Sequence, residues 1–434
     1  MNNTSYLQEK FDEIQSSGTG SHLSGIRQKA FDTYSRLGIP TVRNEEWKYT
    51  RVSGIFNQDY KLADIHPVSV SVEDFETFRL PGYENANQLV FVNGVYSTGL
   101  SVLLSPSLLV IGLEEAAGNE FSSIVSENFN HSSRFLKDGI NALNTAFIHG
   151  AVFIHARRNK AVEHPVYIYN ITDARSEPVL SQPRSLVYVA ENAQLEIVET
   201  YNTLGHSDSI VNQVMEIVVD RDAFLYYYKI QQDSHQASQV STTHIRQVGK
   251  SFAHAVTISL DGNIVRNNLH AILEAPFAEA HMYGLYLQKG NSHVDNHTLV
   301  DHAVPNCESN ELYKGILDDN STGVFNGKVM VRKDAQKTNA FQSNKNILLS
   351  DTASVNTKPQ LEIYADDVKC SHGCTIGSLD PEGLFYLQSR GIPRKAAMAL
   401  LLQGFAVDVT SQIKPAAIRA YVEEMIIERL STEV

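Results

Sequence analysis

The sequence predicts a mainly β chain in which a long strand-rich region lies between helical N-terminal and C-terminal regions. Short runs of Val, Ile, Tyr, Phe and Thr fill the middle of the chain and are broken every several residues by Asn, Asp, Gly or Ser. No pattern typical of a long helix interrupts residues 185–372. We therefore expect an N-terminal helical region over 1–85, a β core over 86–379 and a C-terminal helical region over 380–434.

The N-terminal region carries two apolar stripes with helical spacing. Gly38 and Pro40 are residues that end helices, so the second helix should stop there. The loop that follows holds Trp47, the only tryptophan, which we interpret as a packing anchor, with a binding role as the alternative. The two stripes are Leu7, Phe11 and Ile14, and then Ile26, Ala30, Phe31, Tyr34 and Leu37.

The strand-rich region must protect the unpaired edges of many strands. Small residues recur 30 positions apart at Ala193, Ala223 and Ala253, and each is followed by a strand-like run. This repeat favours a β-solenoid, in which each coil pairs with the next and apolar residues fill a continuous interior. A β-sandwich or a barrel could also protect this many strand edges, and the sandwich is the main alternative. The pattern alone leaves both architectures open.

The C-terminal region shows clear helix signals. Asp380 is a suitable N-cap with Pro381 at the first helical position, and Gly391 with Pro393 should end that helix. A third helix should begin at Pro415, and its apolar stripe must pack against the β core or against another protein. The second helix should contain Ala396, Ala397, Leu400, Leu401 and Phe405, and the stripe of the third is Ile418, Tyr421, Val422, Met425 and Ile426.

Composition and charge argue against two classes of partner. The formal net charge of −13 disfavours nucleic-acid binding, because phosphate contacts need a basic face. The longest apolar runs fall far short of the roughly 20 residues that span a bilayer.

The N-terminus lacks the basic and apolar segments of an export signal, and three cysteines are too few for a disulfide framework. We therefore expect a cytoplasmic protein with reduced thiols and no membrane partner.

The sequence contains no recognisable catalytic motif. Gly249, Lys250 and Ser251 resemble the end of a phosphate-binding P-loop, but His244 stands where that motif requires glycine. The nucleophile elbow, the zinc-protease helix motif and the dinucleotide-binding glycine fingerprint are absent. We therefore expect no catalytic residues and a protein that is not an enzyme.

The densest group of potential metal ligands lies in residues 368–374. If this segment is a strand, Cys370, His372 and Cys374 share one face, because side chains alternate. Thiolate and imidazole are suitable ligands for iron and zinc. Cα atoms four residues apart in a strand are roughly 13 Å apart, so a metal between Cys370 and His372 could not also reach Cys374 unless the chain bends. The segment predicts half of a metal site; the alternative is a Cys/His pair without ligand.

A second cluster, His293, Asp295 and His297, also shares one face of a predicted strand. Histidine and aspartate side chains often satisfy one another by hydrogen bonding, so this cluster predicts a structural network first and a metal site second.

Longer runs of the sequence resemble the SufB/SufD family of the SUF iron–sulfur cluster assembly system, and they are closer to its SufD branch. The resemblance covers most of the chain and is most specific in its C-terminal third. The runs are Gly38-Ile39-Pro40, Glu45 to Tyr49, Tyr313-Lys314-Gly315, Asp318-Asp319, Phe325 to Lys328, Ala335 to Thr338, Thr357 to Gly373, Leu384 to Leu387 and Arg390-Gly391-Ile392.

The resemblance implies a right-handed parallel β-helix between helical ends. It also implies a scaffold role in a complex with one SufB and two copies of the ATPase SufC, in which clusters form on SufB. His372 and Cys370 would lie at the interface with SufB, where His372 would help a SufB cysteine hold iron or a nascent cluster. The role of Cys374 stays open, because many members of the family have alanine there.

Further expectations concern partners and cofactors. The resemblance implies that SufC docks on the C-terminal helices and that iron or a cluster is held only transiently, shared with SufB. A flavin could belong to the complex, and the isolated chain could form a homodimer. The expected docking region includes Leu384, Phe385, Leu387, Arg390, Leu400, Leu401 and Phe405.

Two other functions remain as alternatives. A β-solenoid could carry paired carboxylates and act on polysaccharides, although no spaced carboxylate motif is found. The chain could also bind metal independently through the cluster at 293–302.

Overall fold

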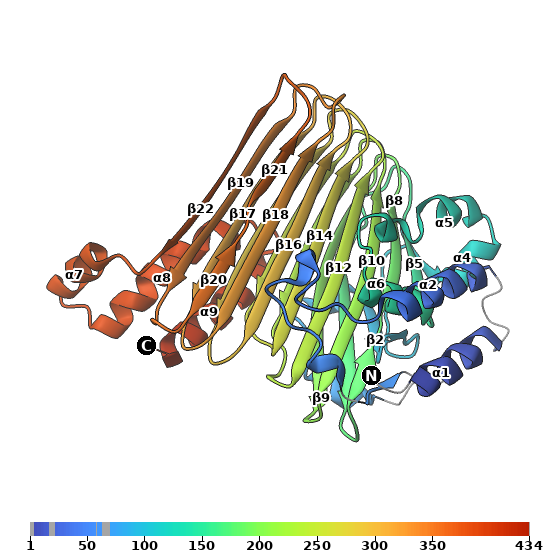
Figure 1. Cartoon of the computed structure of the whole chain (residues 1–434), viewed down its shortest axis with the longest axis horizontal. Helices are drawn as coiled ribbons and strands as arrows, with labels where there is room; N and C mark the ends of the chain where they lie inside the picture. The colour runs from blue at the N-terminus through green and yellow to red at the C-terminus, as the bar shows by residue number, and fades with distance from the viewer. Residues whose placement is uncertain (1–3, 17–21, 58, 63–69, 434) are drawn as a thin grey trace.

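The computed structural model describes residues 4–16, 22–57, 59–62 and 70–433. Its core is a parallel β-solenoid of about eight turns, with helices at both ends of the chain (Figure 1). The predicted fold class is therefore confirmed, and the solenoid rather than the sandwich is correct. Within these residues, no helix is long and apolar enough to cross a membrane.

Two sheets form the walls of the solenoid, and successive coils add parallel strands to each. The first sheet runs in the order β20-β18-β16-β14-β12-β10-β8-β5-β4. Its strands are β4 (Leu108–Gly112), β5 (Val152–Ala156), β8 (Arg184–Val189), β10 (Ser209–Val219), β12 (Ala237–Gln247), β14 (Ile264–Leu273), β16 (His293–His302), β18 (Thr322–Val331) and β20 (Ser354–Thr357), with β1 (Lys61–Leu62), β7 (Val179–Ser181) and β21 (Gln360–Ile363) paired beside this path.

The second sheet runs in the order β22-β19-β17-β15-β13-β11-β9-β6-β2-β3. Antiparallel β3 and β4 close the two sheets at the N-terminal end of the solenoid. The strands of the second sheet are β2 (Asn87–Val92), β3 (Val95–Tyr96), β6 (Val166–Ala174), β9 (Gln194–Gly205), β11 (Phe224–Gln231), β13 (Phe252–Ser259), β15 (Glu279–Gln288), β17 (Glu308–Leu317), β19 (Asn339–Leu348) and β22 (Lys369–Gly377).

The alanine repeat matches the coils only in part. Leu195 pairs with Leu225, so the preceding alanines, Ala193 and Ala223, occupy equivalent places one coil apart. Leu225 then pairs with Ala253, which places the third alanine out of that series. The coil length varies: Phe224 pairs with Phe252, whereas Glu308 pairs with Asn339, three residues further along. Turns of different length absorb this variation, so a fixed period gives only a weak signal.

The predicted terminal helices are present. At the N-terminus α1 (Thr4–Ser16) and α2 (Ser24–Leu37) pack together, and Phe11 stacks on Phe31 with 4.1 Å between ring centroids. Short helical elements follow: η1 (Glu45–Trp47), η2 (Ile55–Asn57), α3 (Val72–Glu76) and η3 (Tyr83–Asn85).

Residues 113–146, which lie inside the expected β core, are largely helical. They form α4 (Leu113–Gly118), α5 (Ser122–Asn128), η4 (His131–Arg134) and α6 (Gly139–Ala146) between β4 and β5. All eight residues of α6 are buried, including the polar Asn141, Asn144 and Thr145, and the helix is only about two turns long, so burial does not follow the polarity of its side chains.

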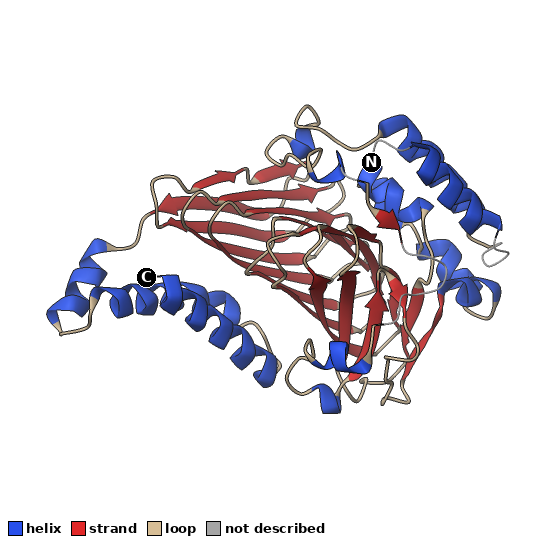
Figure 2. Ribbon diagram, turned by 90° about the horizontal axis from the view of Figure 1, so that it is seen from below, coloured by secondary structure: helices blue, strands red, loops and turns tan. Residues whose placement is uncertain are grey.

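The C-terminal helices cover the outer face of the second sheet, opposite the N-terminal helices (Figure 2). They are α7 (Pro381–Ser389), α8 (Arg394–Thr410) and α9 (Ala416–Glu433). Asp380 caps α7 by accepting a hydrogen bond from the Glu382 N–H. The predicted stripe of α9 is buried against the β core, with Ile418 and Val422 fully covered in the same cluster as Tyr228 and Val256.

Candidate functional site

The C-terminal end of the solenoid is open. β22 is the last strand of the second sheet and, among the described strands, pairs only with β19. β20 and β21 end the first sheet in the same way beside β18. Ile363 and Ile376 at these edges are 38% and 51% exposed. The end therefore presents free backbone hydrogen-bonding groups and apolar side chains, which is typical of a surface that another chain covers.

The potential metal ligands lie on this terminal strand. Cys370 pairs with Ala340 and His372 with Gln342 in the neighbouring coil. Ala340 belongs to the interior core, and Cys370 packs against that same cluster. Because side chains alternate, His372 and Cys374 also lie on the interior side of the sheet, at the mouth of the solenoid.

The three side chains differ in exposure. Cys370 is half-buried, whereas His372 and Cys374 are exposed. Burial raises the pKa of the Cys370 thiol, and a backbone hydrogen bond at Ala340 only partly opposes this. The thiol of the isolated chain is therefore protonated at neutral pH, and a metal would have to displace that proton.

No complete metal site accompanies this strand. Within the described ranges, no three His, Cys, Asp or Glu side chains converge as ligands for a metal ion. Cys370 and His372 could supply two ligands, and the described residues bring no third ligand to them. The chemistry of this ligand pair suits iron or zinc.

The expected docking residues on the C-terminal helices differ in exposure. Phe385 and Leu400 are 74% and 48% exposed, and Arg390 is exposed beside Tyr386. Leu384 is buried, and Phe405 packs against the sheet with the Lys314 ammonium 4.4 Å from its ring centre. Leu387 and Leu401 are half-buried. Val407 lies seven residues after Leu400 and is also 48% exposed, so α8 presents an apolar outer stripe.

The histidine cluster on β16 is a hydrogen-bonded network. Asp295 lies 2.8 Å from the Arg266 guanidinium, and both side chains are 1% exposed. The Thr50 hydroxyl donates to Asp295 and lies 2.9 Å from His293 Nε2. His297 lies 3.1 Å from Asp295 and 3.4 Å from Glu46. Because Arg266 occupies the place beside Asp295 that a cation would need, the independent metal site has no support in this geometry.

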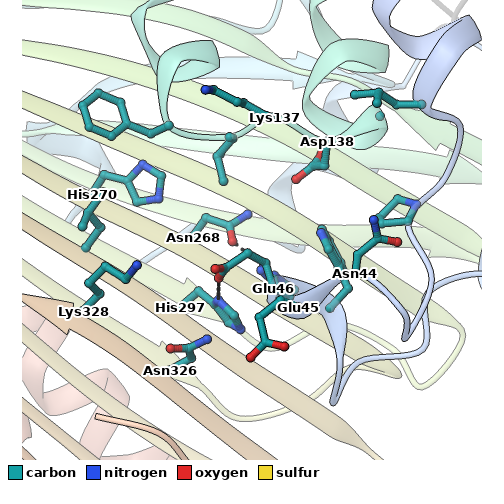
Figure 3. A pocket seen from close by; sticks show the side chains of 18 of the residues that line it. Asn44, Glu45, Glu46, Lys137, Asp138, Asn268, His270, His297, Asn326 and Lys328 are labelled. Carbon is teal, nitrogen blue, oxygen red and sulfur yellow. Dashed lines mark hydrogen bonds and ion pairs between the residues drawn. The ribbon is translucent and has the colours of Figure 1, made fainter. Parts of the chain in front are cut away.

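Glu46, Arg266 and His297 of this network line a pocket of about 380 Å³ (Figure 3). Residues 40–56, which we call the N-terminal strap, cross the outer face of the first sheet and form one wall with Glu45, Glu46 and Trp47. Trp47 is 2% exposed and lies 3.9 Å from the Arg266 guanidinium, which agrees with a packing anchor. Lys137 and Asp138, before α6, form the opposite wall. Most charged groups here already form ion pairs: Glu46 with His297, and Glu45, Arg266 and Lys328 with residues outside the lining. The pocket therefore favours no particular ligand.

Comparisons with known proteins give a consistent result. Residues 170–405 match the family model described as "SUF system FeS cluster assembly, SufBD core domain", and residues 2–168 match "SufBD protein N-terminal region". The chain belongs to the SufB/SufD family. Similar proteins include the iron-sulfur cluster assembly SufBD family protein of Synechocystis, with 31% identity over 97% of this chain and 94% of the relative. The iron-sulfur cluster assembly protein SufD of Escherichia coli is 28% identical over 99% and 98%, and that of Bacillus subtilis is 24% identical over 90% of each chain.

One feature of this SufB/SufD family chain was missed by sequence reasoning. Glu311 and Gln342 lie inside the solenoid next to His372, at register positions that no short motif reveals. Glu311, Gln342 and His372 are 31 and 30 residues apart, so only a correct coil-by-coil alignment would have found them.

Proposed function

We propose that this chain is a non-catalytic scaffold subunit of a cytoplasmic SUF complex, which pairs with SufB through its open end and binds the ATPase SufC through its C-terminal helices. Iron or a nascent cluster is the cargo, held between the two scaffold subunits. The open end with Cys370 and His372 is the observation on which the proposal rests.

Pairing with SufB is supported by the shape of the open end. Two parallel sheets stop there together, and a partner built on the same family's core would present matching strand edges. Strand addition would satisfy the free backbone groups of β22 and cover Ile376. Such pairing would also bring a second set of side chains to His372.

A role in holding iron is supported by the incomplete ligand set. Two ligands from one chain bind a metal weakly, so the site would load only when the partner contributes, for example with a thiolate. This matches a transient cargo better than a resident cofactor.

ATPase binding is supported by the exposed apolar side chains of α7 and α8. Phe385, Leu400 and Val407 would bury substantial apolar area in a complex. Lys314 donates to the Phe405 carbonyl at 2.8 Å and to Asp408 at 2.6 Å, and therefore ties α8 firmly to the sheet. Movement of a docked partner would thus be transmitted to the solenoid.

Affinity purification of the tagged full chain from its native extract tests the assembly. We expect two partners, a SufB-type protein and an ATPase. A Phe385→Ala, Leu400→Ala double variant should lose the ATPase but keep SufB, while Val72→Ala, which removes an exposed apolar group elsewhere, should keep both. A chain that purifies alone, or a double variant that retains the ATPase, would contradict the proposal.

Reconstitution of the purified complex tests the metal site. His372→Ala should leave assembly intact and reduce bound iron and cluster formation, because one ligand is removed. His206→Ala, which removes an exposed histidine on a distant turn, is the matched control and should load iron normally. Equal iron content in the two variants would remove His372 from the mechanism.

A further inference from the structure

A ladder of side chains leads from the core of the solenoid to His372. Met282, Glu311, Gln342 and His372 are successive register partners in β15, β17, β19 and β22. Neighbouring strands lie roughly 4.8 Å apart, and register partners in parallel strands point to the same side. Met282 belongs to the interior core, so the whole ladder faces inward. The first member of this ladder is apolar and the last three are polar.

The two middle residues form a buried pair. Glu311 and Gln342 are 1% and 3% exposed, and Gln342 Nε2 donates to Glu311 Oε2 at 2.7 Å. Burying a carboxyl group is costly, and the same ladder accommodates methionine one coil earlier. Burial raises the pKa of Glu311 to about 7, although the polar side chains of Thr298 and Gln342 oppose the rise. The carboxyl group can therefore lose its proton near neutral pH.

Each member of the pair has one unused acceptor. Glu311 Oε1 and Gln342 Oε1 are buried and have no hydrogen-bond partner within the described part of the chain. Buried acceptors are seldom left unsatisfied, and those that are need an explanation. The next side chain along the ladder from Gln342 is the imidazole of His372, which carries an N–H donor in every protonation state.

We propose that Gln342 and Glu311 are positioning residues for the metal ligand His372. The carboxamide oxygen of Gln342 accepts a hydrogen bond from one ring nitrogen, and its NH₂ group links the ring to the negative charge of Glu311. This inference rests on the proposed function, because it assigns His372 as a ligand. Metal-bound histidines usually donate their second N–H to a carboxylate or carbonyl, which fixes the ring and strengthens it as a ligand.

This chain of hydrogen bonds from His372 through Gln342 to Glu311, which we call the relay, also explains why a glutamine and a glutamate occupy these positions. The hydrogen bond leaves the outer nitrogen of His372 unprotonated and directed to the mouth of the solenoid, where a cation would arrive. A cation on that nitrogen favours the ionised form of Glu311, so the buried negative charge forms when it is needed. Glutamine is a suitable link because it is both a donor and an acceptor.

Nitrogen NMR of histidine-labelled full-length chain tests the relay without any metal. At a pH where His372 is neutral, we expect a single tautomer, assigned by loss of its signal in His372→Ala. Gln342→Met, which keeps the shape but removes both polar atoms, should give a mixture of tautomers. Ser343→Ala, on the same strand but the opposite face, should keep the single tautomer. An unchanged tautomer in folded Gln342→Met would overturn the relay.

Zn²⁺ affinity of the full chain, measured by competition with a coloured chelator, tests its effect on the ligand. Glu311→Gln, which preserves size and removes only the charge, should weaken the His372-dependent binding by about 10-fold, as outer partners of metal ligands typically do. Circular dichroism shows whether the variant is folded. If His372→Ala itself binds Zn²⁺ like the unsubstituted chain, the proposed metal role fails while the tautomer result still decides the relay. If only Glu311→Gln is without effect, the charge link is wrong.

Discussion

Replacement of Asp295 by asparagine should strongly destabilise the contact between the N-terminal strap and the β core. Asp295 forms an ion pair with the fully covered Arg266, at 2.8 Å. Arg266 also donates to the Glu46 carbonyl at 2.6 Å and lies beneath Trp47. The substitution removes the ion-pair partner of a buried guanidinium, which costs about 3–5 kcal/mol.

Asp301 offers a matched control on the same strand and the same face. It pairs with Arg332 at 2.5 Å, but the Arg332 side chain is 50% exposed. Water can solvate Arg332 after Asp301→Asn, so we expect a loss of about 1 kcal/mol or less. Each variant loses one ion pair, so the difference between their free energies of unfolding reports the effect of burying the arginine.

Urea unfolding at pH 7, followed by tryptophan fluorescence, is the assay. Trp47 is the only tryptophan and lies on Arg266, so the signal reports directly on the strap. Burial alone would raise the pKa of Asp295, but Arg266, His297 and Thr50 lower it below its usual range. Its stabilising effect should therefore persist above the unfolded value of about 4 and decline as the pH falls below that value. Equal losses in Asp295→Asn and Asp301→Asn would refute this reasoning.

Two further predictions concern single side chains. At pH 8, iodoacetamide should modify the exposed Cys374 fastest and the buried Cys307 slowest, because burial raises the pKa of the Cys370 and Cys307 thiols. Mass spectrometry of the modified peptides gives the order. Faster reaction at Cys370 than at Cys374 would contradict a protonated Cys370 thiol. Burial lowers the pKa of His302 to about 4, so the free energy of unfolding should decrease as the pH falls from about 6.5 towards 4, by up to about 1.4 kcal/mol per pH unit. In His302→Asn, the urea midpoint should depend less on pH over this range. An unchanged pH dependence in that variant would assign the effect to other groups.

The sequence predicted those elements whose apolar residues follow a simple period. The stripes of α1, α2 and α9 each have one buried face, and the signals at Asp380 and Pro381 locate the start of α7. The insertion that contains α6 was missed because its residues are buried on all sides. Short buried helices and buried strands look alike in sequence.

For the candidate site, the sequence predicted which side chains share a face of one strand, but not how that strand sits in the solenoid. Alternation places Cys370, His372 and Cys374 on a common face, but it cannot say whether that face is interior or exterior. That answer comes from the pairing of Cys370 with Ala340. Contacts such as Arg266 with Trp47 join residues more than 200 positions apart, and no local pattern encodes them.

The strap imposes an order of events during synthesis. Thr50 and its partner Asp295 are 245 residues apart, and Glu45 reaches Lys358 in the last coil. At a synthesis rate of roughly 5–20 residues per second, the N-terminal segment must wait about 12–50 s before its binding surface has been made. During this interval Trp47 has no guanidinium to cover, so the front of the nascent chain would be exposed to chaperones and proteases until the later coils emerge.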